Sequence, residues 1–309
     1  MLEVLQNELT QILVGEIRFQ EPLARYTTWQ IGGPAQVFVI PENLDDVRRV
    51  IAFINEKKKP LFVLGRGSNI LIDDAGLPGV TLYMAKSFKH INVSGSTLRA
   101  GGGVALSRLA HVAARHGYTG FEFLIGIPGT VGAGVLINAG AENSDMRDVL
   151  ESVTLLDWQG NLKTLHASEL ELTYRNSSLF EAPAVIIETV FRLEHLSNPE
   201  KIKHLMQDFI DKRRKKFPLS FPNAGSTFKR PGDGTIPAAG WLLEKAGMKG
   251  YRIGNAQVSE LHANFIINLG HASSEDVKAL IEIMRQRVLE VHDVELEREN
   301  IYFPEECRW

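Results

Sequence analysis

The sequence predicts an α+β protein of two or three domains, and three observations lead to that fold class. A chain of 309 residues is longer than one hydrophobic core usually holds. Residues 35–40, 43–57 and 61–64 read as strand, capped helix and strand, a βαβ unit whose two strands should be parallel. Two further strands at 150–157 and 162–165 flank a Trp-Gln-Gly-Asn turn, which is a hairpin signal.

The other elements follow from apolar periodicity. Helices are predicted near residues 2–13, 105–116, 199–216, 238–246 and 274–292, where apolar side chains recur every three or four positions. Strands are predicted over residues 91–100, 184–193, 264–269 and 295–303. Strand-rich sequence gives way to a helix near residues 196–199, where we place the last domain boundary. The predicted regions are residues 1–82, 83–197 and 198–309.

Composition narrows the function classes. The hydrophobic fraction of 44% and charged fraction of 23% are ordinary for a globular protein. A net charge of −3 argues against general binding to nucleic acid or to a membrane surface. The single cysteine, Cys307, allows no intramolecular disulfide and no cysteine-based metal site. We find no signal peptide and no apolar run of 18 residues, so the expected location is the cytoplasm.

The stretch over residues 126–141 is central to the prediction. It holds five glycines, almost no charge, and apolar residues between the glycines. Glycine disfavours helix and strand, and a flexible linker would be more polar, so we expect a buried loop. Two interpretations remain open: the loop backbone contacts a flat or anionic ligand, or it packs closely against another element.

A second glycine-rich turn, Gly65 to Asn69, directly follows the second strand of the βαβ unit. Phosphates bind at such places in α/β proteins, although an ordinary left-handed turn also needs glycine. The turn is neither a Walker loop nor a Gly-x-Gly-x-x-Gly dinucleotide motif. The glycine run at 101–103 also lacks the third position of that motif.

Three polar segments are further candidates. Residues 174–178, Tyr-Arg-Asn-Ser-Ser, precede a strand, so the arginine can face solvent or a cleft. The helix over 199–216 ends in five cations, which either complement the helix dipole or bind a phosphate. Residues 223–229 form a small-residue turn with one serine hydroxyl near a lysine. There is no Gly-x-Ser-x-Gly motif and no His-x-x-x-His pair, since His111 and His116 lie five apart.

These motifs together give a specific resemblance. In order along about 240 residues stand Thr-Thr to Gly-Gly at 27–33, the turn at 65–69, the stretch at 126–141, Tyr-Arg-Asn-Ser at 174–177, Asn-Ala-Gly-Ser-Thr-Phe-Lys at 223–229 and His-Ala-Asn-Phe-Ile-Ile-Asn at 262–268. The chain resembles the UDP-N-acetylenolpyruvoylglucosamine reductases, flavoenzymes that make UDP-N-acetylmuramic acid for peptidoglycan. The short segment after the arginine resembles the second type of this family, which lacks an inserted loop with a substrate-contacting tyrosine.

The resemblance implies an FAD-binding fold of the vanillyl-alcohol-oxidase (PCMH) type, built from two subdomains, with a C-terminal α+β substrate-binding domain. It implies FAD as cofactor, NADPH as co-substrate, UDP-N-acetylglucosamine enolpyruvate as substrate, and a monomer. The residues expected to bind FAD are Gly65, Arg66, Gly67, Ser68, Asn69, Gly126, Ile127, Pro128, Gly129, Thr130, Gly132, Ala133 and Gly134. The residues expected to bind substrate are Tyr174, Asn223, Lys229 and Lys216, and no metal site is expected.

The resemblance also implies catalytic roles. Ser226 matches the proton donor, Arg175 the catalytic arginine, and Glu299 the glutamate of a terminal Leu-x-x-Glu-Val motif, with Asn300 in place of the usual apolar residue. Glu297 and Glu295 stay open as alternatives, because period two would place them on the same strand face. Arg175 suits the substrate carboxylate, where negative charge builds after hydride transfer. Ser226 needs nearby positive charge from Lys229 or the lysines at 215 and 216, and Glu299 needs burial to stay protonated.

Two other functions remain open. A flavin oxidase of the same superfamily would consume oxygen with an alcohol or sugar donor, although no histidine or cysteine stands where it would tether the flavin. A non-catalytic nucleotide-binding module would tolerate loss of the Ser226 hydroxyl without any measurable effect.

Overall fold

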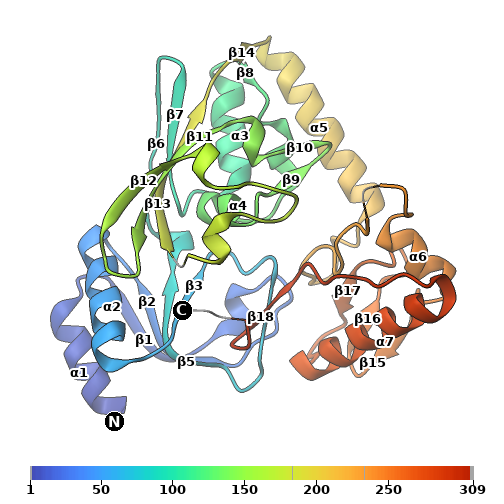
Figure 1. Cartoon of the computed structure of the whole chain (residues 1–309), viewed down its shortest axis with the longest axis horizontal. Helices are drawn as coiled ribbons and strands as arrows, with labels where there is room; N and C mark the ends of the chain where they lie inside the picture. Colours follow the sequence, from blue (N-terminus) through green and yellow to red (C-terminus); the bar gives the residue numbers. More distant parts are fainter. Residues whose placement is uncertain (1, 183, 233, 307–309) are drawn as a thin grey trace.

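The computed structural model describes residues 2–182, 184–232 and 234–306, so Cys307 lies outside the described residues. The chain forms three lobes (Figure 1). The N-terminal region, with α1 and α2, and the second region, with α3 and α5, meet through their sheets. The C-terminal region, with α6 and α7, lies beside both, and its last segment runs back to the N-terminal region at β18.

The first lobe is a four-stranded sheet of order β1-β2-β5-β3, covered by two helices. Its elements are α1 (Leu2–Ile12), β1 (Glu16–Pro22), β2 (Pro34–Ile40), α2 (Leu44–Lys57), β3 (Leu61–Leu64) and β5 (Leu77–Tyr83). The Asn43 side chain accepts a hydrogen bond from the Asp46 N–H, which confirms the predicted cap of α2. The strands β2 and β3 are parallel as predicted, but they are not neighbours, because β5 lies between them and pairs with both.

The second lobe is an antiparallel sheet of order β12-β11-β13-β7-β6. Its main elements are β6 (Ile91–Ser94), β7 (Thr97–Gly101), α3 (Leu106–Arg115), α4 (Val131–Leu136), β11 (Leu150–Asp157), β12 (Leu162–His166), β13 (Ala184–Arg192) and α5 (Pro199–Lys216). The predicted hairpin is confirmed as β11 and β12. Short strands complete the region: β8 (Tyr118–Thr119), β9 (Gly140–Ala141), β10 (Ser144–Asp145) and β14 (His195–Leu196).

Two predictions for this lobe are wrong. Residues 91–100 are a hairpin and not one strand, because Gly95, with φ of +55°, turns the chain between Ser94 and Thr97. Residues 126–141 are not all loop, since they contain the short helix α4, capped by Thr130. Tertiary contacts on a buried helix outweigh the low helix propensity of its glycines.

The third lobe has a small antiparallel sheet, β15-β16-β17, with two helices. Its elements are α6 (Ala239–Lys245), β15 (Arg252–Ile253), β16 (Ala256–Val258), β17 (Ile266–Asn268) and α7 (Ser274–His292). The strand predicted over residues 295–303 is wrong in length, because only β18 (Ile301–Phe303) is a strand. The residues before it make two backbone hydrogen bonds to the turn at 223–229, from Lys229 N–H to Glu297 O and from Glu299 N–H to Thr227 O.

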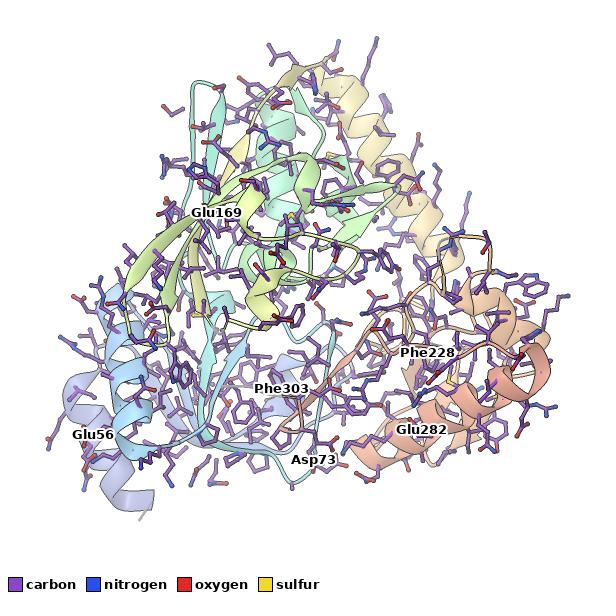
Figure 2. The ribbon with its side chains drawn as sticks, in the orientation of Figure 1. Glu56, Asp73, Glu169, Phe228, Glu282 and Phe303 are labelled. Atoms are coloured by element: carbon purple, nitrogen blue, oxygen red, sulfur yellow. The ribbon has the colours of Figure 1, made fainter. Side chains whose placement is uncertain are left out.

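Two connections tie the C-terminal region to the first lobe. β18 pairs in parallel with β4 (Ile70–Ile72), and the Phe303 ring lies 5.4 Å from that of Phe62. Figure 2 labels Phe303 at this junction and Asp73 below it. Trp29, from the first lobe, is fully buried in the C-terminal core. Its indole N–H donates to Ile266 O at 2.9 Å.

The helix α5 packs on the second lobe, because Ile202 and Met206 belong to the same apolar core as α3. The domain division at 82/83 and 197/198 stays a prediction. This packing favours a last boundary closer to the end of α5.

Candidate active site

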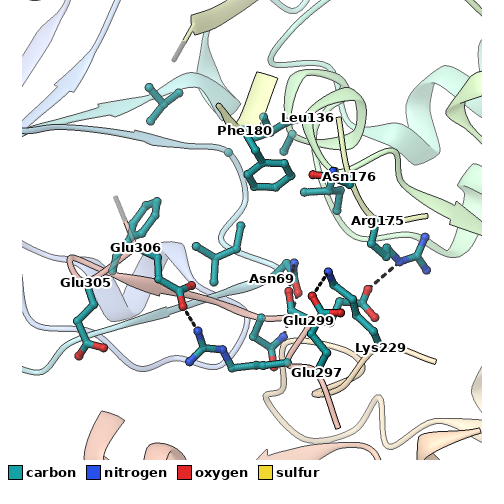
Figure 3. Close-up of a pocket in the computed structure, with 18 of the residues that line it drawn as sticks. Asn69, Leu136, Arg175, Asn176, Phe180, Lys229, Glu297, Glu299, Glu305 and Glu306 are labelled. Carbon is teal, nitrogen blue, oxygen red and sulfur yellow. Dashed lines mark hydrogen bonds and ion pairs between the residues drawn. The ribbon is translucent and has the colours of Figure 1, made fainter. Parts of the chain in front are cut away.

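A cavity of about 1040 Å³ lies where the three lobes meet. The end of β3, the start of α4, the segment before β13, and the C-terminal segment from Glu295 to Glu306 all contribute to its wall. Figure 3 shows Asn176 and Phe180 on one side of it, facing Glu299 and Asn69 on the other. The cavity therefore brings together segments that are more than 200 residues apart in sequence.

The two glycine-rich segments lie against each other at this cavity. The Ser68 hydroxyl donates to Pro128 O at 2.5 Å. A Cβ on Gly65 would come 2.7 Å from the Thr130 hydroxyl oxygen, so the close approach requires glycine there. Gly65, Asn69 and Thr130 all line the cavity. The strand end and the helix start thus form one continuous wall.

The packing interpretation of the stretch at 126–141 is confirmed for some of its glycines. Gly126 allows α5 to pack closely, since a Cβ there would lie 2.8 Å from Arg213 Cδ. Gly134 has the same kind of role toward Leu106. Gly132 lines the cavity, and its N–H donates to Gly102 O at 2.9 Å. Contact of this stretch with a ligand stays a prediction.

The same stretch holds the loop that carries Arg175. Asn138 donates through Nδ2 to Thr173 O at 2.8 Å, and the Ser177 hydroxyl donates to Leu136 O at 2.6 Å. Arg175 Nη2 donates to Gly140 O at 2.9 Å. Arg175 itself has φ of +56°, a backbone conformation that a side-chain-bearing residue adopts only when its surroundings fix it.

Arg175 and Glu299 form an ion pair across the cavity, with 2.8 Å between Nε and Oε1 (Figure 3). Their side chains are 21% and 14% exposed. Burial raises the pKa of the Glu299 carboxyl, whereas Arg175 and then Lys229 act to lower that pKa. The net direction is upward, so burial outweighs the positive charges and favours the protonated acid.

The neighbouring acids differ from Glu299. The Glu297 side chain is 72% exposed and pairs with Lys229 at 2.5 Å, and that of Glu295 is 80% exposed and pairs with Arg285. All three acids line the cavity. The assumption of a regular strand face here is wrong, because the segment makes only an isolated bridge between Phe228 and Arg298. Burial favours Glu299 over the other two.

Ser226 lies on the turn opposite this segment. The turn is built by Asn223, whose side-chain oxygen accepts from the Gly225 N–H at 3.0 Å. Ser226 is partly buried and does not line the cavity, but its carbonyl accepts a hydrogen bond from Asn300 Nδ2 at 3.4 Å. Asn300 lines the cavity, so Ser226 is one residue removed from the cavity wall.

The structure brings eight of the predicted site residues together at the cavity and leaves the others outside it. Those that line it are Gly65, Asn69, Thr130, Gly132, Ala133, Arg175, Lys229 and Glu299. Those that do not are Arg66, Gly67, Ser68, Gly126, Ile127, Pro128, Gly129, Gly134, Tyr174, Asn223, Lys216 and Ser226. Tyr174 is 51% exposed, and its hydroxyl accepts from the Arg230 N–H at 3.4 Å.

Gly102, Asn176 and Asn300 are among the cavity-lining residues that sequence reasoning did not assign to the site. The glycine run at 101–103, set aside as a weak dinucleotide motif, was a signal for Gly102. The signal for Asn300 was a polar residue at a position where the resembled family has an apolar one. We find no signal that separated Asn176 from the rest of its polar segment.

The five cations at the end of α5 differ in their exposure to solvent. Arg213 is partly buried against Gly126, and its guanidinium carbon lies 4.9 Å from the centre of the Phe217 ring. Burial lowers the pKa of Arg213. Lys212, Arg214, Lys215 and Lys216 are exposed. Within the described residues there is no group of three or more metal-binding side chains, and no helix there is long and apolar enough to cross a bilayer.

Comparison with known proteins agrees with this geometry. Residues 35–166 match the FAD binding domain model, and residues 217–303 match the model of the UDP-N-acetylenolpyruvoylglucosamine reductase C-terminal domain. The chain is 42% identical over 299 residues to the UDP-N-acetylenolpyruvoylglucosamine reductase of Caldanaerobacter subterraneus, covering 96% of this chain and 97% of that one. The chain belongs to the UDP-N-acetylenolpyruvoylglucosamine reductase family.

Other members of the family agree. UDP-N-acetylenolpyruvoylglucosamine reductase 1 of Bacillus anthracis is 40% identical over 299 residues, covering 96% of this chain and 98% of that one. The crystal structure of the reductase from Thermus caldophilus superposes with a TM-score of 0.77 at 33% identity, covering 94% of this chain and 99% of that one. The predicted fold class, an FAD-binding region followed by a C-terminal α+β domain, is confirmed.

Proposed function

We propose that this chain reduces UDP-N-acetylglucosamine enolpyruvate to UDP-N-acetylmuramate with NADPH as the electron donor, a step in peptidoglycan precursor synthesis, and that FAD binds in the central cavity. Family membership makes the chain an FAD-dependent oxidoreductase. The observation that carries the assignment to this cavity is the partly buried Arg175–Glu299 pair facing a glycine-lined wall.

The residues at the cavity fit FAD. The cavity volume of about 1040 Å³ is at the upper end for ligand pockets, which suits a dinucleotide. Gly65, Gly102 and Gly132 leave the backbone open to a flat ring or a pyrophosphate, and Val63 and Ile186 supply apolar wall. The N–H groups of residues 65–69 donate to no other described residue, so they are free to bind phosphate oxygens. FAD, when bound, supplies hydride transfer from NADPH to the methylene carbon of the enol ether.

Arg175 would hold the substrate carboxylate. Hydride transfer leaves negative charge on the substrate, and this charge spreads toward the substrate carboxylate. A guanidinium that is already fixed in place stabilises the charge without reorganisation. Three backbone carbonyls, those of Thr173, Leu136 and Gly140, already fix the loop and the guanidinium. When substrate enters, the carboxylate competes with Glu299 for Arg175, and loss of that ion pair raises the pKa of Glu299 further.

Ser226 and Glu299 would share the protonation of the adjacent carbon. Glu299 can donate a proton because its burial favours the acid form. Ser226 is a weak acid by itself, so it needs the nearby positive charge of Lys229. The hydroxyl has to turn toward the cavity once substrate is bound, since Ser226 lies one residue behind the wall.

The remaining assignments are part of the same proposal. Tyr174, Asn223, Lys229 and Lys216 bind the sugar nucleotide, and the protein belongs to the second type of the family, because the sequence between Arg175 and β13, which begins at Ala184, is short. We further propose a cytoplasmic monomer.

The test starts with the purified protein, which should be yellow and lose its flavin absorbance under NADPH. Adding UDP-N-acetylglucosamine enolpyruvate should restore the absorbance and yield UDP-N-acetylmuramate. Colourless protein that cannot be reconstituted with FAD would contradict the proposal. Rapid oxygen consumption with an alcohol donor, without sugar-nucleotide turnover, would instead indicate an oxidase.

A further inference from the structure

Asn300 is a buried polar residue at the centre of the site. Its side chain is 2% exposed, and it directly follows Glu299. Phe228 and Arg298 form an antiparallel bridge, and Glu299 N–H donates to Thr227 O, so the same register places Ser226 opposite Asn300. Asn300 is thus adjacent to both residues proposed to protonate the substrate.

The side-chain amide nitrogen of Asn300 makes all the hydrogen bonds of this side chain. Its Nδ2 atom has three acceptors within hydrogen-bond distance, Asn69 Oδ1 at 3.0 Å, Ala224 O at 3.2 Å and Ser226 O at 3.4 Å, and its two hydrogens are shared among them. Reversing the amide would bring its oxygen against three acceptors, so the hydrogen-bond pattern fixes the orientation. The side chain therefore joins the turn of Ser226 to Asn69.

The other end of the side chain is unsatisfied. Asn300 Oδ1 is buried and has no hydrogen-bond partner among the described residues. An apolar residue of similar volume would avoid that desolvation cost. The hydrogen bonds that Nδ2 donates are therefore the reason for asparagine at this position.

Asn69 closes the network. Its Nδ2 donates to Glu299 O at 3.1 Å while its Oδ1 accepts from Asn300. Asn69 ends the turn that begins at Gly65, and both of these residues line the cavity. The two asparagines thereby connect the Glu299 backbone, the Ser226 backbone and the turn at 65–69.

We propose that Asn300 is a positioning residue that holds Ser226 and Glu299 at a fixed distance from the turn at 65–69, and so from the substrate between them. This inference rests on the proposed function. It assigns Asn300 no contact with the reacting atoms, because its polar groups face the chain's own backbone and Asn69.

The test compares Asn300→Val with Asn300→Thr. The two replacements have nearly the same shape, but only threonine keeps a hydrogen-bond donor. Stopped-flow absorbance separates the step in which NADPH removes the flavin absorbance from the step in which substrate restores it. For Asn300→Val we expect the first rate to fall less than about threefold and the second about tenfold, the size of one lost hydrogen bond. Asn300→Thr should recover most of the second rate.

Amide hydrogen exchange supplies a readout that does not depend on turnover. In Asn300→Val, peptides that cover residues 223–229 should exchange several-fold faster than in the unchanged protein. Peptides of β11 and β13 should exchange at the same rate, and Asn300→Thr should restore protection of residues 223–229.

Each outcome is decisive. Equal second-step rates for Asn300→Val and the unchanged protein, or equal losses for the valine and threonine variants, would overturn the inference. If Asn300→Val does not fold, a slow second step or fast exchange in Asn300→Thr overturns it, and near-normal values for both support it. Failure of the unchanged protein to turn over substrate contradicts the proposed function instead, and the exchange comparison still tests the positioning role.

Discussion

The C-terminal region meets the other two lobes in different ways. Toward the first lobe it is joined by strand pairing of β4 with β18, by buried Trp29, and by Ser274, whose N–H and hydroxyl donate to Asp74 at 2.7 and 2.8 Å. Lys278 adds contacts from α7 to Asp73 and Glu305. These contacts join secondary structure and buried side chains, so the two regions form one body.

Toward the second lobe the contacts are sparse. In the part of the chain that the structure describes, we note two polar contacts between these regions: Arg175 to Glu299 across the cavity, and Arg230 N–H to the Tyr174 hydroxyl outside it. The difference shows how the groups of the site are held. Ser226 and Glu299 belong to the C-terminal region, which is joined to the first lobe, whereas Arg175 belongs to the second lobe and meets the C-terminal region at the cavity.

The largest expected effect comes from replacing Ser226, the proposed proton donor. Ser226→Ala should leave removal of the flavin absorbance by NADPH intact and slow its return with substrate by a factor of roughly 10² to 10⁴, the range for a lost general acid. Stopped-flow absorbance measures both steps. Ser220→Ala, at an exposed serine six residues earlier, is the control and should behave as the unchanged protein.

The second-largest effect is expected from replacing Arg175, which lies on the second lobe. Arg175→Ala should slow the substrate step by roughly 10² to 10³, the cost of removing a donor aimed at developing charge. Arg175→Lys keeps the charge without the planar fork and should recover only part of this loss. Single-turnover rates with substrate measure the effect. If both variants turn over normally, Arg175 does not contact the substrate carboxylate.

Two aromatic substitutions, one at each interface of the C-terminal region, test whether the two interfaces contribute differently to the free energy of unfolding. Trp29→Phe leaves the buried Ile266 carbonyl without its donor and opens space, so we expect a loss of about 2 kcal/mol in the free energy of unfolding. Tyr174→Phe removes an exposed hydroxyl contact between the second lobe and the C-terminal region and should cost less than about 0.5 kcal/mol. Urea unfolding of both variants gives the values. Equal losses would contradict the view of one tight and one sparse interface.

The smallest expected effect is a change in pH dependence. Because the pKa of Glu299 is raised in the folded protein, its contribution to stability is fully present below 4.5, the ordinary glutamate value, and is lost as pH rises through the raised pKa. Glu299→Gln removes this titration, so the variant should become more stable relative to the unchanged protein as pH rises. Urea midpoints from pH 4 to pH 8 measure the trend. Glu297→Gln, at a side chain that is 72% exposed, is the matched control variant.

Local signals predicted most of the fold. The helices α5 and α7 begin and end at the predicted residues, because Asn198 and Ser273 cap them and apolar periodicity runs through both. The errors lie where a tertiary contact decided the outcome. The helix α4 forms from a glycine-rich sequence, and β5 separates two strands that a βαβ unit alone would place side by side.

For the site, the sequence predicted which residues belong to it better than how those residues are arranged in space. Arg175 and Glu299 were expected, but their pairing across 124 residues depends on how the lobes pack. Burial of Glu299 beyond that of Glu297 likewise depends on the opposite lobe. The backbone donors of the turn at 65–69 were expected from its glycines. By contrast, the bonds that hold the Arg175 loop to Gly140 and Leu136 had no sequence signal.

The pairing of β18 with β4 also bears on how the protein is made. The strand at Ile301–Phe303 joins one at Ile70–Ile72, so the partner of this early strand is synthesised only after all of the residues between the two strands. The preceding residues include Glu299. A nascent or prematurely terminated chain therefore lacks both the closing strand and the acid beside it, which means that no shortened product ending before residue 299 can acquire the complete site.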